Sequence, residues 1–354
     1  MKKLKIGVIG VGSISGAHIN GYLNNPNVEL YALCDIDEEK LKKKGEKYGI
    51  TRLFTNADDM LALDELDAVS VCTWNAAHKD CTIKALKAKK HVLCEKPMAM
   101  NKAEAEEMKK VAEDNGVLLM IGFVRRHGND TKVLKEFIDN GDLGELYYAK
   151  TKYIRRNGCP GGWFGNKELS GGGPLIDLGV HTIDLIKYLM GNPKPVSVYA
   201  ATFDKLGKRE DKINGGGYVS ETKNVEEIFN VEDLAVATIR FDNGAILTVE
   251  TSFSLNTKKK EEGGIEIYGT KGGASFTPDL EIYNNLNGYL TNVSFADSTK
   301  FDFTAVFCNE INHFVDCILN GTECIATADD GIALMAILDA AYESARTGHE
   351  VILA

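Results

Sequence analysis

The sequence lacks any long apolar run. None of its 354 residues lies in a hydrophobic stretch near the roughly 20 residues that a membrane-spanning helix needs. The basic amino terminus, Met1–Lys5, precedes an apolar segment, Ile6–Val11, that is too short for the core of a secretory signal. We therefore expect a cytoplasmic protein that has no membrane partner.

Basic charge is also scarce. The chain has 41 Lys and Arg against 51 Asp and Glu, a net charge of −10 and an isoelectric point near 5.3. Binding to nucleic acid requires basic surface that neutralises phosphates, so this balance opposes a nucleic-acid partner. The lysine clusters Lys42–Lys44 and Lys258–Lys260 are short and flanked by acids, which is typical of solvated faces.

The eight cysteines include no C-x-x-C pair. They are scattered along the chain, at Cys34, Cys72, Cys81, Cys94, Cys159, Cys308, Cys317 and Cys324. This distribution is typical of small buried side chains in a reducing compartment. We expect no metal site.

The length and the first third of the chain predict two domains, one of them a doubly wound α/β domain. A typical domain has about 150 residues. Up to residue 124, continuous apolar β-rich runs alternate with amphipathic helical stretches, which is the pattern of a parallel sheet covered on both faces. The expected strands are Lys5–Ile9, Glu29–Cys34, Ala68–Thr73, His91–Cys94 and Leu118–Gly122.

From residue 125 to residue 354 the pattern changes to a second, α+β domain. Its closely spaced strands have little helix between them, and Asp242-Asn243-Gly244 is a strong hairpin signal. We expect a mostly antiparallel or mixed sheet with helices on one side. The polar, glycine-rich segment Lys205–Lys223 is interpreted as a long loop.

A Gly-x-Gly turn connects the first strand to a helix. Gly10 permits the tight turn, and Gly12 lets the backbone approach a pyrophosphate, while Ser13 and Ile14 open the helix whose N–H groups face the anion. Ser15 replaces the third glycine of the fingerprint, so the packing of helix on strand must admit a larger side chain. The turn predicts a dinucleotide site.

Asp35 follows the second strand at the expected distance from this turn. Its carboxylate can accept hydrogen bonds from both ribose hydroxyls, and it would repel a 2′-phosphate. The next residues, Ile36 and Asp37, supply no arginine that could compensate. NAD is therefore favoured over NADP as the cofactor; a plain turn and cap residue is the alternative for Asp35.

Further ligands are expected at the carboxyl ends of later strands, where open α/β sheets bind their ligands. Thr73, Asn75 and His78 follow one strand, and Glu95 and Lys96 follow the next. We assign all five to the cofactor site, with packing as the alternative for His78.

The stretch Gly171–Asp184 predicts a helix that carries a reactive face. Pro174 suits a first-turn position after three glycines, and the helix is expected to run to Met190. Asp177, His181 and Asp184 then stand at i, i+4 and i+7, on one face. A carboxylate that orients an imidazole, near Lys96 from a strand end, is a device for moving a proton at neutral pH.

With these motifs in this order, the chain resembles the glucose-fructose oxidoreductase, inositol dehydrogenase and rhizopine-catabolism family (Gfo/Idh/MocA). The likeness covers nearly the whole chain and includes Tyr268-Gly269-Thr270-Lys271-Gly272 and Ala341-Tyr342-Glu343-Ser344. The resemblance implies a Rossmann domain, a C-terminal α/β domain whose large open sheet forms a homodimer or homotetramer, and NAD(P)-dependent oxidation or reduction of sugars and polyols.

The resemblance also implies substrate contacts. It gives Lys96, Asp177 and His181 roles at the substrate, and it makes Arg125, in Gly122–Arg126, the candidate arginine at the cofactor–substrate junction. The loop Arg155–Trp163, with Arg156 and Trp163, is similar to one in members that act on pyranosides and anhydrosugars, although Cys159 stands where an aliphatic residue is commoner. A structural Ω-loop with a packed Trp163 is the alternative.

The expected reaction is hydride transfer between NAD and a secondary alcohol. His181 serves as the base, Lys96 stabilises the developing alkoxide, and Asp177 binds an adjacent hydroxyl or orients the imidazole. Asp184 is assigned a structural role. Two alternatives stay open: a glycosidase that acts by transient NAD-dependent oxidation and elimination, and a sensor that binds NAD without turnover.

Overall fold

The computed structural model describes residues 3–207, 219–221, 228–276, 279–296 and 299–353. Most of the expected loop 205–223 lies outside these residues. By its internal contacts the chain divides into two compact units. The first contains the described residues up to Val124 together with 219–221 and 303–335, and the second contains the rest. One division falls between Val124 and Arg125, and residues 303–335 belong to the first unit by their contacts.

The first unit is built on a parallel six-stranded sheet in the order β3-β2-β1-β4-β5-β6. The order reverses between β1 and β4, which pair side by side, and an open α/β sheet binds its ligand at such a switch point. The strand bounds are Leu4–Ile9, Val28–Cys34, Leu53–Phe54, Ala68–Val71, His91–Glu95 and Leu119–Gly122 for β1 to β6. The five longer strands match the expected parallel strands, whereas the two-residue, partly exposed β3 was not expected.

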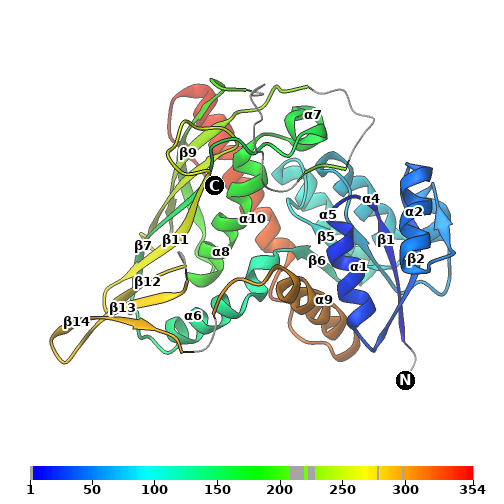
Figure 1. Cartoon of the computed structure of the whole chain (residues 1–354), viewed down its shortest axis with the longest axis horizontal. Coiled ribbons are helices and arrows are strands. Elements are labelled where there is room, and N and C mark those ends of the chain that lie inside the picture. Colours follow the sequence, from blue (N-terminus) through cyan, green and yellow to red (C-terminus); the bar gives the residue numbers. More distant parts are fainter. Residues whose placement is uncertain (1–2, 208–218, 222–227, 277–278, 297–298, 354) are drawn as a thin grey trace. The chain divides into compact units, whose positions relative to one another are not determined.

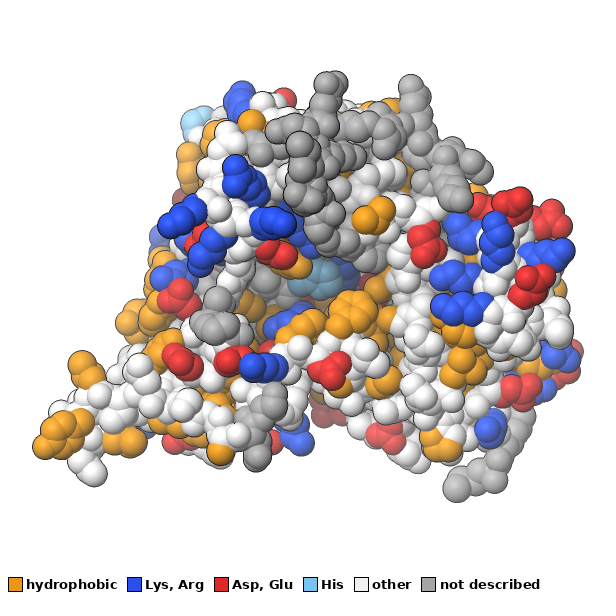
Figure 2. All heavy atoms as spheres, in the orientation of Figure 1, with side chains coloured by type: hydrophobic (Ala, Val, Ile, Leu, Met, Phe, Trp, Pro, Cys, Tyr) orange, Lys and Arg blue, Asp and Glu red, His pale blue; other side chains and the backbone are white. Residues whose placement is uncertain are grey.

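Helices connect these strands (Figure 1). They are α1 (Ser15–Asn24), α2 (Glu38–Tyr48), α3 (Ala57–Leu61), α4 (Asn75–Lys87) and α5 (Lys102–Asn115). Acidic and basic side chains intermingle over α2, as Figure 2 shows. A later helix, α9 (Phe303–Asn320), packs on α1 so closely that a Cβ on Gly21 would lie 2.7 Å from the Ile311 side chain. This packing explains why α9 belongs to the first unit.

The second unit contains a nine-stranded sheet in the order β14-β13-β12-β11-β7-β10-β9-β8-β15. Only β10 and β7 pair in parallel, so the sheet is mostly antiparallel, as expected. Three of the strands, β13, β14 and β15, were not expected from the sequence. The bounds of β7 to β15 are Leu146–Arg155, Pro195–Phe203, Leu234–Phe241, Ile246–Ser252, Glu261–Gly269, Gly272–Ser275, Glu281–Leu286, Tyr289–Ser294 and Val351–Ile352.

Helix α8 (Val180–Leu189) packs on one face of this sheet, against β7 and β11 (Figure 1). The other long helices are α6 (Asn129–Asp139) and α10 (Ala328–Thr347), and the unit division falls within α10. A short helix, α7 (Lys167–Ser170), precedes the glycine run. Among the described residues, no helix is both long enough and apolar enough to cross a membrane.

Candidate cofactor and substrate sites

The two glycines of the β1–α1 turn have different surroundings. Gly10 has φ +85°, and a Cβ there would stand 2.7 Å from the Cys72 carbonyl oxygen, so no other residue fits. A Cβ on Gly12 would meet no heavy atom within 4 Å. Ser15, at the third position of the fingerprint, is buried and donates its hydroxyl to the Gly12 carbonyl at 2.6 Å. The open space at Gly12 fits the close approach of a pyrophosphate.

The start of α1 fits an anion as well. Ile14 stands at the N-cap and provides no side-chain cap, so the first-turn N–H groups are not satisfied by a capping side chain. Lys44 from α2 places Nζ 3.4 Å from the Gly12 carbonyl, so a basic group that the sequence did not predict stands at this turn. The hydroxyl of Ser13 donates to the Val219 carbonyl at 3.2 Å, and its predicted contact with the cofactor stays a prediction.

The carboxylate of Asp35 is held at the end of β2 by two backbone groups. Oδ2 accepts from the Val11 N–H at 2.7 Å, and Oδ1 accepts from the Asp37 N–H at 2.9 Å. Each carboxylate oxygen has a second lone pair, so both can still accept from a hydroxyl. Asp35 can therefore hold the turn through backbone N–H groups and still accept hydrogen bonds from ribose hydroxyls.

His78 links the ends of two neighbouring strands. It is 1% exposed, with Nδ1 2.7 Å from the Pro97 carbonyl and Nε2 3.1 Å from the Thr73 carbonyl. Burial lowers the pKa of His78, although both carbonyls and Glu95 favour the charged ring. This geometry matches the packing interpretation and gives no support to the predicted cofactor contact of His78. Asn75, the first residue of α4, is also buried.

Glu95 belongs to a buried network that fixes the segment carrying Lys96. Its Oε1 lies 2.8 Å from Nε2 of His18, and its Oε2 accepts the Lys96 N–H at 3.0 Å. The other ring nitrogen of His18 lies 3.1 Å from the Ser70 hydroxyl. Burial alone would raise the pKa of Glu95, but the hydrogen bond and charge of His18 outweigh it and lower that pKa. Lys96 follows directly and is half-buried, before a cis bond to Pro97.

In the second unit, the helix expected from Pro174 to Met190 is not α-helical throughout. Leu175–Gly179 forms a π-helical turn, and α8 begins at Val180. The expectation of one regular helix is therefore wrong for its first turn, and π turns occur frequently at functional sites. From Leu175 to Lys187 only Asp177, His181 and Thr182 are not buried. Asp177 and His181 thus share the accessible part of this segment.

Asp184 does not share that exposure. It is 2% exposed and accepts a bidentate pair of hydrogen bonds from Arg126, with Nε to Oδ2 at 3.0 Å and Nη2 to Oδ1 at 2.6 Å. The three residues therefore do not form a single accessible face, which corrects the expectation for Asp184. The contact agrees with the structural role assigned to Asp184.

The glycine run before Asp177 permits a close approach of two other segments. A Cβ on Gly172 would lie 2.0 Å from the Tyr342 hydroxyl, and a Cβ on Gly173 would lie 2.1 Å from the Glu232 carbonyl. The buried Glu232 carboxylate accepts the N–H groups of Gly173 and Leu175 and the Tyr342 hydroxyl, at 2.9, 3.2 and 3.0 Å. Burial raises the pKa of Glu232, against these hydrogen bonds. Glu232 lies outside every motif of the sequence and was not predicted.

The remaining predicted substrate residues have distinct surroundings. Arg125 reaches the buried Asp130 carboxylate at 3.3 Å and stacks 4.1 Å over the Phe301 ring, and burial lowers its pKa. Arg156 is exposed at the end of β7. Trp163 stacks on Phe164 with ring centroids 3.9 Å apart, which agrees with the packed-loop alternative and leaves a substrate contact untested.

Both parts of the chain match domains of one family. Residues 4–123 match the NAD-binding Rossmann fold of the Gfo/Idh/MocA oxidoreductases, and residues 135–353 match their C-terminal alpha/beta domain. The chain belongs to the Gfo/Idh/MocA oxidoreductase family. This family comprises NAD-dependent oxidoreductases of sugars and inositols, as the resemblance implied.

Individual relatives of this Gfo/Idh/MocA protein act on carbohydrates. The chain is 36% identical over 353 residues to the D-glucoside 3-dehydrogenase of Escherichia coli (strain K12), covering 98% of this chain and 97% of the relative. It is 28% identical over 282 residues to the myo-inositol 2-dehydrogenase of Thermotoga maritima, covering 76% and 74%. The crystal structure of GenD2 from gentamicin A biosynthesis, in complex with NAD, superposes with a TM-score of 0.81 at 25% identity, covering 100% and 97%.

Proposed function

We propose that this protein is an NAD-dependent dehydrogenase that oxidises a secondary ring alcohol of a sugar, polyol or glycoside. The main support is that Asp177 and His181 are accessible. Between Leu175 and Lys187, every other residue except Thr182 is buried. The 36% identity to a D-glucoside 3-dehydrogenase makes D-glucosides the first substrate class to test.

Gly12, Ser13, Ile14 and Asp35 would hold the cofactor. The open space at Gly12, the helix start without a side-chain cap at Ile14 and the oriented Asp35 carboxylate support this assignment. The nicotinamide ring supplies the hydride acceptor when NAD is bound. The Asp35 carboxylate would accept from the ribose hydroxyls and repel a 2′-phosphate, so NAD is preferred over NADP.

The protein's own residues would handle the proton and the substrate oxygen. His181 removes the hydroxyl proton as the carbonyl forms, because an imidazole exchanges protons near neutral pH. Lys96 donates a hydrogen bond to the same oxygen and stabilises its developing negative charge. Asp177 binds an adjacent hydroxyl or orients the imidazole, and Arg125, Arg156 and Trp163 contact the rest of the substrate.

A substrate panel tests the proposal directly. D-glucosides, aldoses and inositols would be incubated with NAD, and absorbance of the reduced nicotinamide would be followed together with chromatography of the sugar products. We expect a keto-sugar and NADH in equal amounts. Release of free sugar without net NADH would contradict the proposal and favour the glycosidase alternative. Tight NAD binding with no product from any compound would instead favour a sensor.

We also propose that the protein forms a homodimer or homotetramer through its nine-stranded sheet. Tyr199, Thr238, Thr248, Lys150 and Glu266 stand at paired positions on one face across five strands, none of them buried. The β13–β14 hairpin also exposes Leu286, Tyr289 and Leu290, and Figure 2 shows apolar side chains at its tip. Apolar side chains gathered at one exposed place can mark a surface that another chain covers. A stable monomer in sedimentation at micromolar concentration would contradict this assembly.

A further inference from the structure

Three potential metal ligands meet at the carboxyl end of α9. His313 and Cys317 stand one turn apart on this helix, and Cys324 lies in the segment that follows it. Their ligand atoms all lie within 4.8 Å of one another, and Nε2 of His313 is 3.5 Å from Sγ of Cys317. All three belong to the first unit but to none of its nucleotide-binding motifs.

The spacing agrees with tetrahedral zinc coordination. Zinc lies about 2.0–2.1 Å from a histidine nitrogen and about 2.3 Å from a cysteine sulfur. At a tetrahedral angle these bonds separate the two ligand atoms by about 3.5 Å, close to the observed Nε2–Sγ distance. Two ligands one helical turn apart and a third from the following segment can therefore surround one ion without a change in the path of α9.

Negative charge also lies beside the cluster, because the Asp316 carboxylate acts on both His313 and Cys317. His313, Cys317 and Cys324 are each partly exposed, so an ion can reach them from solvent. A divalent cation would replace the thiol protons, as it does in structural zinc sites.

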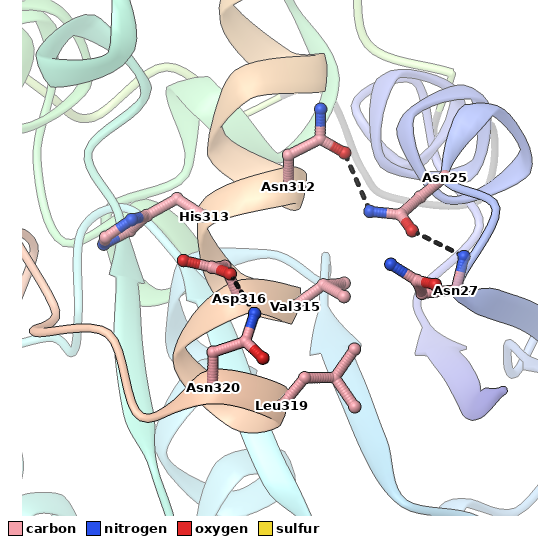
Figure 3. A pocket seen from close by; sticks show the side chains of 8 residues that line it. All are labelled: Asn25, Asn27, Asn312, His313, Val315, Asp316, Leu319 and Asn320. Atoms are coloured by element: carbon pink, nitrogen blue, oxygen red, sulfur yellow. Dashed lines mark hydrogen bonds between the residues drawn. The ribbon is translucent and has the colours of Figure 1, made fainter. Parts of the chain in front are cut away.

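We propose that His313, Cys317 and Cys324 bind Zn²⁺, with water at the fourth position. In Figure 3 the His313 ring points away from the bonded pair Asn25 and Asn312, so the proposed ion does not compete with that contact. The neighbouring Asp316 carboxylate accepts from the side chains of Asn320 and Thr322, which orders the turn that brings Cys324 close. The proposed site differs from the prediction, made from the sequence, that the protein has no metal site.

Zinc binding would secure the segment after α9 to the parallel sheet. The Ala326 carbonyl accepts the Ile121 N–H at 3.0 Å, and Thr327 forms a β-bridge with Met120 of β6. The Ile325 N–H also donates to Nε2 of His313 at 3.1 Å, and this bond must break when the single lone pair of that nitrogen binds the ion. One neutral hydrogen bond is worth much less than a metal–ligand bond, so the exchange is favourable.

The test is metal binding by the full-length protein under reducing conditions. After treatment with a chelator, the protein would be titrated with Zn²⁺ in competition with a chromophoric chelator, and separately with Co²⁺. We expect one tightly bound Zn²⁺ per chain and a thiolate-to-cobalt charge-transfer band. Cys317→Ser and Cys324→Ser should each weaken Zn²⁺ binding by more than about 100-fold, because even the loss of an outer-shell partner costs 10–100-fold.

Cys308→Ser is the matched control, because Cys308 lies on the same helix outside the cluster. It should keep both the affinity and the cobalt band. Cys324→Ser changes a single atom outside α9, so circular dichroism can show that this variant is folded when its binding is lost. Absence of stoichiometric Zn²⁺ binding in the unmodified protein would overturn the proposal. Equal binding by the unmodified protein and folded Cys324→Ser would also overturn it. None of these readouts depends on turnover, so they separate this proposal from the proposed function.

Discussion

The imidazole of His18 and the carboxylate of Glu95 form a buried pair, with Nε2 2.8 Å from Oε1. His18 is fully buried, and Glu95 is 6% exposed. Because the other oxygen of Glu95 accepts the Lys96 N–H, this pair joins α1 to the end of β5 beside the proposed catalytic lysine. Through Glu95, His18 therefore helps to fix the backbone at Lys96.

The first prediction concerns this pair. His18→Gln should lower the free energy of unfolding by about 1–3 kcal/mol, because it removes the imidazole that contacts both the buried Glu95 carboxylate and the Ser70 hydroxyl. Urea denaturation measures the change. The exposed His349 provides the control, since His349→Gln should leave stability within about 0.5 kcal/mol. A loss no larger in His18→Gln than in the control would show that the pair does not stabilise the fold.

The second prediction concerns Glu310, a fully buried carboxyl of α9 whose two oxygens have no hydrogen-bond partner among the described residues. Burial, and then the charge of Glu95, raises its pKa well above the ordinary 4.5. The folded protein therefore keeps a proton that the unfolded chain releases. This contribution to stability is complete below the unfolded pKa and is lost as pH rises, by up to about 1.4 kcal/mol per pH unit.

Glu310→Gln removes this titration. As the pH rises from about 5 to about 8, the unfolding free energy of the wild type should fall relative to that of the variant. Urea denaturation of both proteins across this range measures it. A difference that is constant with pH would mean that Glu310 does not hold a proton in the folded state.

The third prediction separates the two glycines of the turn. Gly10→Ala should destabilise the fold, because its Cβ would collide with backbone at 2.7 Å and its φ is +85°. Gly12→Ala meets open space and should keep the melting temperature while weakening NADH binding. Thermal unfolding and fluorescence titration measure the two effects. Unchanged NADH affinity in Gly12→Ala would remove this turn from the cofactor site.

The fourth prediction concerns the choice of cofactor. The unmodified protein should bind NADH more tightly than NADPH. Asp35→Ala should reduce this difference in affinity, because it removes both the ribose hydrogen bonds and the repulsion of a 2′-phosphate. Asp37→Ala is the control: Asp37 caps α2 through the Lys40 N–H, so its loss should cost about 1 kcal/mol of stability without changing the preference. Equal affinities of the unmodified protein for NADH and NADPH, measured by fluorescence titration, would contradict the assignment of Asp35 to the ribose.

The fifth prediction concerns the chemistry. His181→Ala and Lys96→Met should each reduce turnover by at least about 100-fold while NADH binding stays nearly intact. Steady-state kinetics on the substrate found in the panel measures the loss. Asp184→Asn, which disrupts the buried pair with Arg126, should instead lower stability. Full turnover by His181→Ala across the pH range would rule out His181 as the base.

Much of the fold follows from local patterns in the sequence. The strand–turn–helix from Leu4 to Asn24 is encoded by adjacent residues, because apolar runs select buried strands and Gly10 permits a backbone angle that other residues disfavour. The alternation of strands and helices predicted the parallel sheet, and the closely spaced strands predicted the mostly antiparallel one. Asp35, Lys96, Asp177 and His181 are proposed as site residues because they stand beside such local signals.

Tertiary structure alone decided the surroundings of these residues. Spacing placed Asp184 with Asp177 and His181, but the π-helical turn and the bond to Arg126 separate its role from theirs. Glu232 accepts the Gly173 N–H only because folding brings together two residues that are 59 positions apart in the sequence. α9 joins the first unit through its contact with α1. A local pattern specifies backbone conformation, whereas pairing of distant side chains depends on how the whole chain packs, and single-residue signals do not encode it.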